Sequence, residues 1–111
     1  MKNYKFGLIA EYFIIFYYII CFYKILHHRY KTKVGEIDVI MLRRRELVFI
    51  EVKARQKGMH ENIISIGQQK RLIRAAEFFI TKHKNYSNYN LRFDLALVRP
   101  YRLPIIIKKA W

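Results

Sequence analysis

Two short apolar runs joined by a polar connection constrain the fold more than any other feature of this sequence. Residues 36–42 read Glu-Ile-Asp-Val-Ile-Met-Leu, and residues 46–54 read Glu-Leu-Val-Phe-Ile-Glu-Val-Lys-Ala. Runs of this length that are rich in β-branched and apolar residues are typical of strands buried on both faces. The connection Arg43-Arg44-Arg45-Glu46 has a length that suits a type I turn, so we expect a hairpin.

Three charged side chains interrupt this predicted hairpin. If Leu42 pairs with Leu47, the same register places Asp38 opposite Glu51. Lys53 follows Glu51 by two residues, so both side chains point to the same face of their strand. We therefore predict that two acids and a lysine converge on one patch.

Two carboxylates that face each other beside an apolar core repel and are costly to desolvate. A divalent cation between Asp38 and Glu51 would remove that conflict, and carboxylate oxygens suit Mg²⁺ or Mn²⁺ better than zinc. The alternative is a structural salt bridge in which Lys53 pairs with both acids. The spacing alone leaves both interpretations open.

The rest of the chain predicts helices and strands in alternation. We expect a helix in the N-terminal region, a strand over residues 24–33, and a further strand over residues 91–98 with an edge strand at 105–107. Ser65-Ile66-Gly67-Gln68 has the form of a capping box and predicts the start of a second helix. The apolar face of this helix is expected to contain Leu72, Ile73, Ala76, Phe79 and Ile80.

These elements predict an α/β fold with a central mixed β-sheet flanked by helices, in the order α-β-β-β-α-β. No repeat or long linker divides the chain, so we expect a single domain over residues 1–111.

Residues 12–23 are uncharged and lie between Glu11 and Lys24, which raises the question of a membrane segment. As a helix this run covers ~18 Å, against ~30 Å of hydrocarbon, and extending it to Phe6 would bring Glu11 into the bilayer. We therefore expect a buried core helix and no integral membrane span. Membrane association through residues 6–23 stays as an alternative.

The charge balance predicts a polyanionic partner. The chain has 22 Lys and Arg against 8 Asp and Glu, a net charge of +14, which favours nucleic acid or an anionic membrane surface. Cys21 is the only cysteine, which favours a reducing, cytoplasmic location. A homodimer is compatible with the sequence. The candidate contacts to nucleic acid are Arg43, Arg44, Arg45, Arg55, Lys57, Gln69, Lys70, Arg71 and Arg74.

Three separated motifs resemble the YraN family of bacterial proteins, which have a restriction-endonuclease-like PD-(D/E)XK fold. The first motif has two parts, Gly35-Glu36-Ile37-Asp38-Val39-Ile40 and Glu51-Val52-Lys53-Ala54-Arg55, which are similar to the GEIDLI and FVEVKAR parts of the family signature. Residues 69–76 resemble the central helix of the family, and Arg92-Phe93-Asp94 its last core strand. Phe22 stands where a turn glycine is common in the family.

This resemblance implies that Asp38 and Glu51 hold Mg²⁺ or Mn²⁺ and that Lys53 positions or activates the attacking water. It also implies that Glu11, on the first helix, joins the metal site. Glu36 and Asp94 match family positions where a structural role is equally expected. The implied activity is metal-dependent cleavage of phosphodiester bonds in DNA, including branched or damaged DNA. The alternative is a non-catalytic nucleic-acid-binding protein with a vestigial nuclease site.

Overall fold

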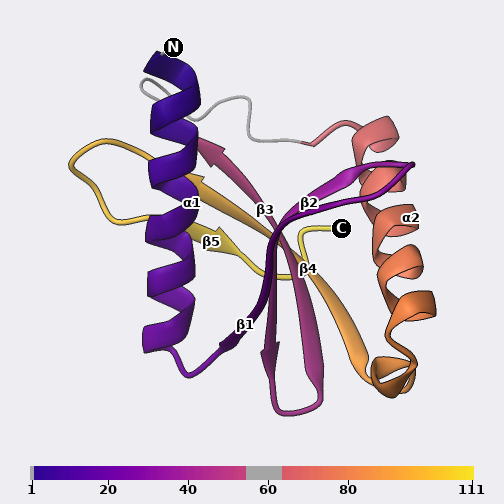
Figure 1. The fold of residues 1–111 in the computed structure, drawn as a ribbon. Coiled ribbons are helices and arrows are strands. Elements are labelled where there is room, and N and C mark those ends of the chain that lie inside the picture. Colours follow the sequence, from indigo (N-terminus) through magenta and orange to yellow (C-terminus); the bar gives the residue numbers. More distant parts are fainter. Residues whose placement is uncertain (1, 55–63) are drawn as a thin grey trace.

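Two helices cover opposite faces of a five-stranded sheet in the computed structural model, which describes residues 2–54 and 64–111 (Figure 1). This arrangement confirms the predicted α/β class and the order α-β-β-β-α-β, followed by the short edge strand. The elements are α1 (Lys2–Ile20), β1 (Lys24–Lys31), β2 (Glu36–Arg43), β3 (Glu46–Ala54), α2 (Ile66–Lys82), the 3₁₀ helix η1 (Lys84–Tyr86), β4 (Asn90–Val98) and β5 (Ile105–Ile107).

The sheet is mixed, as expected. Its strands lie in chain order from β1 to β5, and all neighbours are antiparallel except β3 and β4, which are parallel. Parallel neighbours need a crossover connection, and α2 lies within it. The apolar residues of α1 and those of α2 pack into two separate core clusters. The sheet is therefore buried on both faces.

The β2–β3 hairpin has the predicted register, with Leu42 paired to Leu47 and the ladder continuing to Val39 and Ile50. The predicted four-residue connection is wrong, because Arg43 still pairs with Glu46 and only Arg44 and Arg45 form the turn. Arg44 has a φ of 58°. Tight two-residue hairpin turns use positive φ because it matches the twist of the strands.

Helix α2 begins after Ser65, whose hydroxyl accepts a hydrogen bond from the Gln68 N–H at 3.1 Å. The predicted apolar face is rotated slightly. Ile73 is 37% exposed, and Ala75 is buried in its place. The fully buried side chains of α2 are Leu72, Ala75, Ala76 and Phe79.

Helix α1 corrects the prediction of a buried core helix. One face packs on the sheet through Ala10, Ile14, Ile15 and Tyr18. The opposite face is exposed although it is apolar, because no described element covers α1 from outside (Figure 1). Among the described residues, no helix is long and apolar enough to cross a bilayer.

Candidate metal centre

Glu51 and Asp38 lie on the α2 face of the sheet. Ile50 and Val52 pack toward α1, so the strand alternation turns Glu51 toward α2. The Gln68 side-chain amide, from the first turn of α2, donates to Glu51 Oε2 at 2.8 Å. Lys53 Nζ is 3.5 Å from the same oxygen. Glu51 is therefore held between the sheet and the start of α2.

Asp38 directly precedes Val39, which pairs with Ile50 at the end of the β2–β3 ladder. Its Oδ2 accepts a hydrogen bond from the Val52 N–H at 2.8 Å. Asp38 and Glu51 both line a cavity of about 250 Å³, together with Gly35, Glu36, Gln68, Arg71 and Leu72. The predicted convergence of Asp38, Glu51 and Lys53 on one face is thus present in the fold.

Both carboxyl groups are unfavourable as anions. Burial, and then the negative charge of Glu51, raise the pKa of Asp38 to about 8, although the Val52 N–H acts in the opposite direction. Burial also raises the pKa of Glu51, and the charge of Lys53 partly offsets this. Because Lys53 compensates only part of the charge, the pair favours either a proton or an added cation.

The donor set fits a hard divalent cation. Mg²⁺ in proteins is often bound through one or two carboxylates, with water and substrate phosphate completing its six ligands. Asp38 and Glu51 supply two carboxylates at a cavity that has room for water. Within residues 2–54 and 64–111, no group of three or more His, Cys, Asp or Glu side chains is placed to hold a metal ion.

Glu11 is the candidate for the third acidic ligand that the family resemblance implies. It is buried in α1, where its Oε1 lies 2.7 Å from His28 Nε2 and accepts a hydrogen bond from Arg29 Nε at 2.8 Å. Its negative charge contributes to the raised pKa of Asp38. The structure thus brings Glu11 within electrostatic range of the pair and binds its carboxylate to two basic side chains of β1.

Of the basic contacts predicted on α2, Arg71 lies beside the carboxylate pair, because it lines the same cavity. Lys70, Arg71 and Arg74 are all exposed. Gln69 is half-buried, and its amide donates to the Ile64 carbonyl at 2.8 Å. This side chain therefore holds the segment just before α2 in place.

Arg43, at the end of β2, and the turn residues Arg44 and Arg45 lie at the other end of the hairpin. Six residues separate Arg45 from Glu51, which is roughly 20 Å along a strand. Arg43 donates to the Cys21 carbonyl at 3.2 Å, and the Arg45 guanidinium lies 4.5 Å from the Tyr89 ring centroid. Arg44 is exposed. Arg55 and Lys57, also predicted to contact nucleic acid, lie outside the described residues.

Gln68 is a residue of the candidate site that the sequence patterns did not reveal as one. Its position three residues after Ser65 predicted a capping box, in which the glutamine side chain would return to the cap. Only the Ser65 half of that motif forms, because the Gln68 amide reaches Glu51 instead. A polar residue in the first turn of a helix beside an acidic strand was the available signal.

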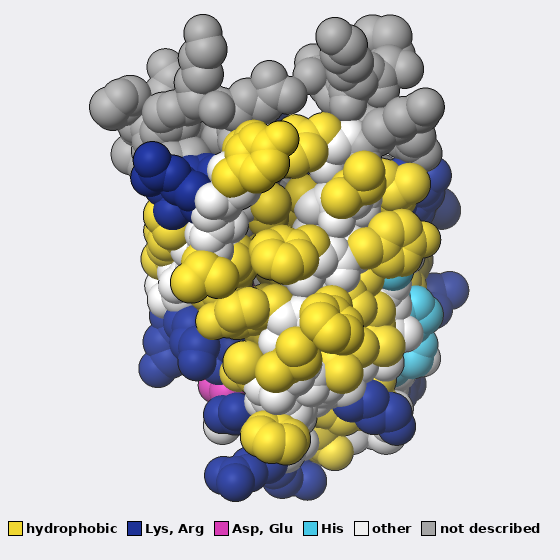
Figure 2. Space-filling model, turned by 90° about the vertical axis from the view of Figure 1, so that its left-hand side faces the viewer, with side chains coloured by type: hydrophobic (Ala, Val, Ile, Leu, Met, Phe, Trp, Pro, Cys, Tyr) yellow, Lys and Arg dark blue, Asp and Glu magenta, His cyan; other side chains and the backbone are white. Residues whose placement is uncertain are grey.

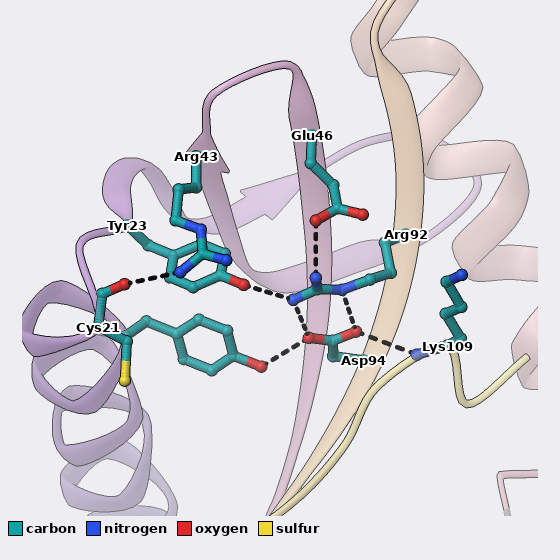
Figure 3. A network of polar contacts seen from close by, with 8 residues as sticks. Cys21, Tyr23, Arg43, Glu46, Arg92, Asp94 and Lys109 are labelled. Atoms are coloured by element: carbon teal, nitrogen blue, oxygen red, sulfur yellow. Dashed lines mark hydrogen bonds and ion pairs between the residues drawn. The ribbon is translucent and has the colours of Figure 1, made fainter.

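A second buried polar cluster lies on the α1 face of the sheet (Figure 3). Arg92 donates to both oxygens of Asp94, at 2.9 and 2.8 Å, and to Glu46 at 2.8 Å and the Tyr23 hydroxyl at 2.9 Å. The Tyr18 hydroxyl also donates to Asp94, at 2.8 Å. Asp94 therefore has a structural role in joining α1 to β4.

Comparisons with known proteins agree with these motifs. Residues 10–98 match the model of the uncharacterised protein family UPF0102. A UPF0102 protein of Ehrlichia chaffeensis is 40% identical over 99% of this chain and 94% of its own length. A relative from Nitrobacter winogradskyi is 39% identical over 88% and 84%, and one from Parvibaculum lavamentivorans is 36% identical over 100% and 84%. The chain therefore belongs to the UPF0102 family, which is the YraN family that its motifs resemble.

Proposed function

We propose that this protein is a metal-dependent endonuclease that hydrolyses phosphodiester bonds in DNA. The observation that carries the proposal is a pair of carboxylates, the buried Glu51 and the partly buried Asp38, which line one cavity with Lys53 Nζ 3.5 Å from Glu51. Folding such a pair is unfavourable unless a ligand compensates its charge. A bound divalent cation would remove this cost.

Asp38 and Glu51 would hold Mg²⁺ or Mn²⁺, which when bound lowers the pKa of a water ligand and offsets charge that develops on the phosphate. The Val52 N–H and the Gln68 amide orient one oxygen of each acid, which fixes the carboxylates before a ligand arrives. Lys53 would direct its ammonium group at the attacking water or at the phosphate, where positive charge favours the transition state. The branched or damaged character of the DNA rests on the family resemblance alone.

Basic residues of α2 would place the DNA backbone at this site. Arg71 lines the cavity, and Lys70 and Arg74 are exposed on the same helix. Such side chains bind phosphates without reading bases, so they supply affinity and position. Affinity for DNA should therefore fall steeply as salt is added.

The alternative is a DNA-binding protein without turnover, and the setting of Glu11 favours it. His28 and Arg29 bind the Glu11 carboxylate, so that group would have to be shared or released before it joined a metal ion. The basic surface of α2 would serve binding in either case.

A cleavage assay separates the two functions. Linear, nicked and four-way-junction DNA would be incubated with Mg²⁺ or Mn²⁺ and the wild type, Asp38→Asn or Lys53→Ala. We expect each variant to lose cleavage by at least about a hundredfold, since each removes a group that acts on the reacting phosphate.

Charge-matched controls are available on α2. Glu77→Gln and Lys82→Ala change the net charge as the two site variants do, at exposed positions. Both should cleave like the wild type. Cleavage that survives Asp38→Asn and Lys53→Ala would reject this site, and DNA binding without cleavage by the wild type would favour the non-catalytic function.

A further inference from the structure

The outward side of α1 is apolar and open to solvent. Ile9, Tyr12, Phe13, Phe16 and Ile20 are each between 40% and 63% exposed. Their spacing of three or four residues, with Phe13 beside Tyr12, places them on one side of the helix. We call these five residues the outer face of α1. Figure 2 shows this side of the molecule as a nearly continuous area of hydrophobic side chains.

Helix α1 differs from an ordinary surface helix in where its polar and apolar residues lie. Surface helices turn their polar residues outward and their apolar residues inward. Between Lys5 and Lys24 the only charged residue is Glu11, and it points inward to His28 and Arg29. The sequence therefore keeps the outer face uncharged, although the chain as a whole is rich in Lys and Arg.

Phe22, just beyond the helix, adds an independent observation. The Tyr23 N–H donates to the Tyr18 carbonyl at 3.0 Å and the Phe22 N–H to the Ile19 carbonyl at 2.9 Å, which is the helix end that usually takes glycine. Phe22 has a φ of 74°, and its side chain is 86% exposed. A phenylalanine is thus strained at this position and gains little burial within the chain. Strain of this kind is often a sign of function.

Basic side chains border this area on both sides and below, as the dark blue patches in Figure 2 show. Lys24 and Arg44 are exposed near the end of α1, where Arg43 bonds the Cys21 carbonyl. Apolar and aromatic side chains bordered by Lys and Arg are typical of helices that lie in the interface of an anionic bilayer. A second copy of this chain would instead bring a molecule with its own net charge of +14 close to the first, and the two would repel.

We propose that the outer face of α1 and Phe22 dock the protein on an anionic lipid bilayer, with α1 lying along the membrane surface. The partner is a bilayer that contains acidic phospholipids. Since α2 covers the opposite face of the sheet (Figure 1), Asp38 and Glu51 stay directed away from the lipid. Docking is therefore compatible with the proposed nuclease function and independent of it.

Co-sedimentation with vesicles tests the proposal. The full chain would be mixed with vesicles of phosphatidylcholine, with or without phosphatidylglycerol, and the variants would be Phe16→Ser and Phe22→Gly. We expect binding only to the anionic vesicles, weakened roughly tenfold by Phe16→Ser because one apolar side chain no longer enters the bilayer. Ile66→Ser is the matched control, because Ile66 is 69% exposed but lies on α2.

Phe22→Gly distinguishes docking from a role in folding. Glycine relieves the strained backbone, so this variant should unfold at a higher temperature while binding vesicles more weakly. The proposal is overturned if Phe16→Ser binds like the wild type, or if vesicles without phosphatidylglycerol bind equally well. A concentration-dependent dimer that Phe16→Ser dissociates, with no vesicle binding, would instead assign the outer face to a second copy.

Discussion

The buried charges on the two faces of the sheet differ in how they are compensated. On the α1 face, Asp94 accepts hydrogen bonds from Arg92 and Tyr18, and from the Lys109 N–H at 3.3 Å. On the α2 face, Asp38 and Glu51 share one cavity, and Lys53 is their nearby ammonium group. In the part of the chain that the structure describes, each cluster has one cation and two carboxylates, but they are bonded differently. Arg92 donates two hydrogen bonds to Asp94 and one to Glu46, whereas Lys53 lies 3.5 Å from Glu51 and Asp38 accepts its hydrogen bond from the neutral Val52 N–H.

This difference separates a structural cluster from the proposed metal site. A buried carboxylate with a guanidinium partner and further donors is stable without a ligand. A carboxyl group such as that of Asp38, whose pKa is raised to about 8, favours a bound proton or cation. The closely bonded cluster thus joins α1 to β4, whereas the weakly compensated pair is the place where we propose a metal ion.

Removing Asp94, the main partner of Arg92, should change the free energy of unfolding most. Asp94→Ala leaves the Arg92 guanidinium, which is only 6% exposed, without its main counter-charge. We expect a loss of about 3 to 5 kcal/mol in the free energy of unfolding, measured by urea titration. The control Glu77→Ala, at an exposed position of α2, should change it by less than about 0.5 kcal/mol. A similar small change for Asp94→Ala would contradict the structural role.

Removing the charge of Asp38 should stabilise the protein instead. Without metal, Asp38→Asn should raise the free energy of unfolding by roughly 1 to 3 kcal/mol near pH 8, because asparagine avoids the buried anion. In the wild type the folded state holds the Asp38 proton up to a pKa of about 8, while the ordinary value is 3.8. Stability from this group is therefore full at acidic pH and lost as the pH rises toward 8.

The gain from Asp38→Asn should accordingly be small near pH 4 and grow until about pH 8. Urea titrations at several pH values measure it, with Glu77→Gln as the control for net charge. A variant that is less stable than the wild type throughout this range would show that Asp38 has a structural role like that of Asp94.

Removing one hydrogen bond to Asp94 should lower the free energy of unfolding less than removing Asp94 itself. Tyr18→Phe deletes the donor to Asp94 at 2.8 Å and keeps the aromatic packing against Tyr23. Because Arg92 still pairs with Asp94, we expect a loss of about 1 kcal/mol by urea titration. A loss as large as that of Asp94→Ala would mean that the hydroxyl, not the guanidinium, compensates this carboxylate.

The smallest effect is expected from Glu11. Its charge helps to raise the pKa of Asp38, so Glu11→Gln should lower that pKa by less than about one unit. Carbon-detected NMR titration of the Asp38 carboxyl group would measure the change. An unchanged pKa would separate Glu11 from the carboxylate pair and weaken its assignment as a metal ligand.

The position of the carboxylate pair was predictable from local patterns. Side chains along a strand alternate between its two faces, and this geometry, together with the Leu42–Leu47 pairing, was enough to place Asp38 and Glu51 on one face. The turn was predicted too long because Arg44 has a positive φ, and tight turns usually have Gly, Asn or Asp at such a position. This error did not move the pair, since the Leu42–Leu47 register is the same for both loop lengths.

Other features depend on contacts between distant segments. Helix α1 is apolar on every side, so no periodicity identified which face would pack on the sheet and which would stay exposed. Arg92 and Asp94 are visible as a charged pair in a strand, but their bonds to Tyr18, Tyr23 and Glu46 join residues far apart in sequence. The role of Gln68 likewise depends on how α2 meets β3.

We propose that Asp38 and Glu51 together bind a divalent cation, and a Mn²⁺ titration followed by electron paramagnetic resonance tests this most directly. We expect the wild type and the Glu77→Gln control to bind Mn²⁺ alike, and Asp38→Asn to bind it at least about tenfold more weakly, since one of two carboxylate ligands is lost. Equal Mn²⁺ affinity for Asp38→Asn and the wild type would contradict the account.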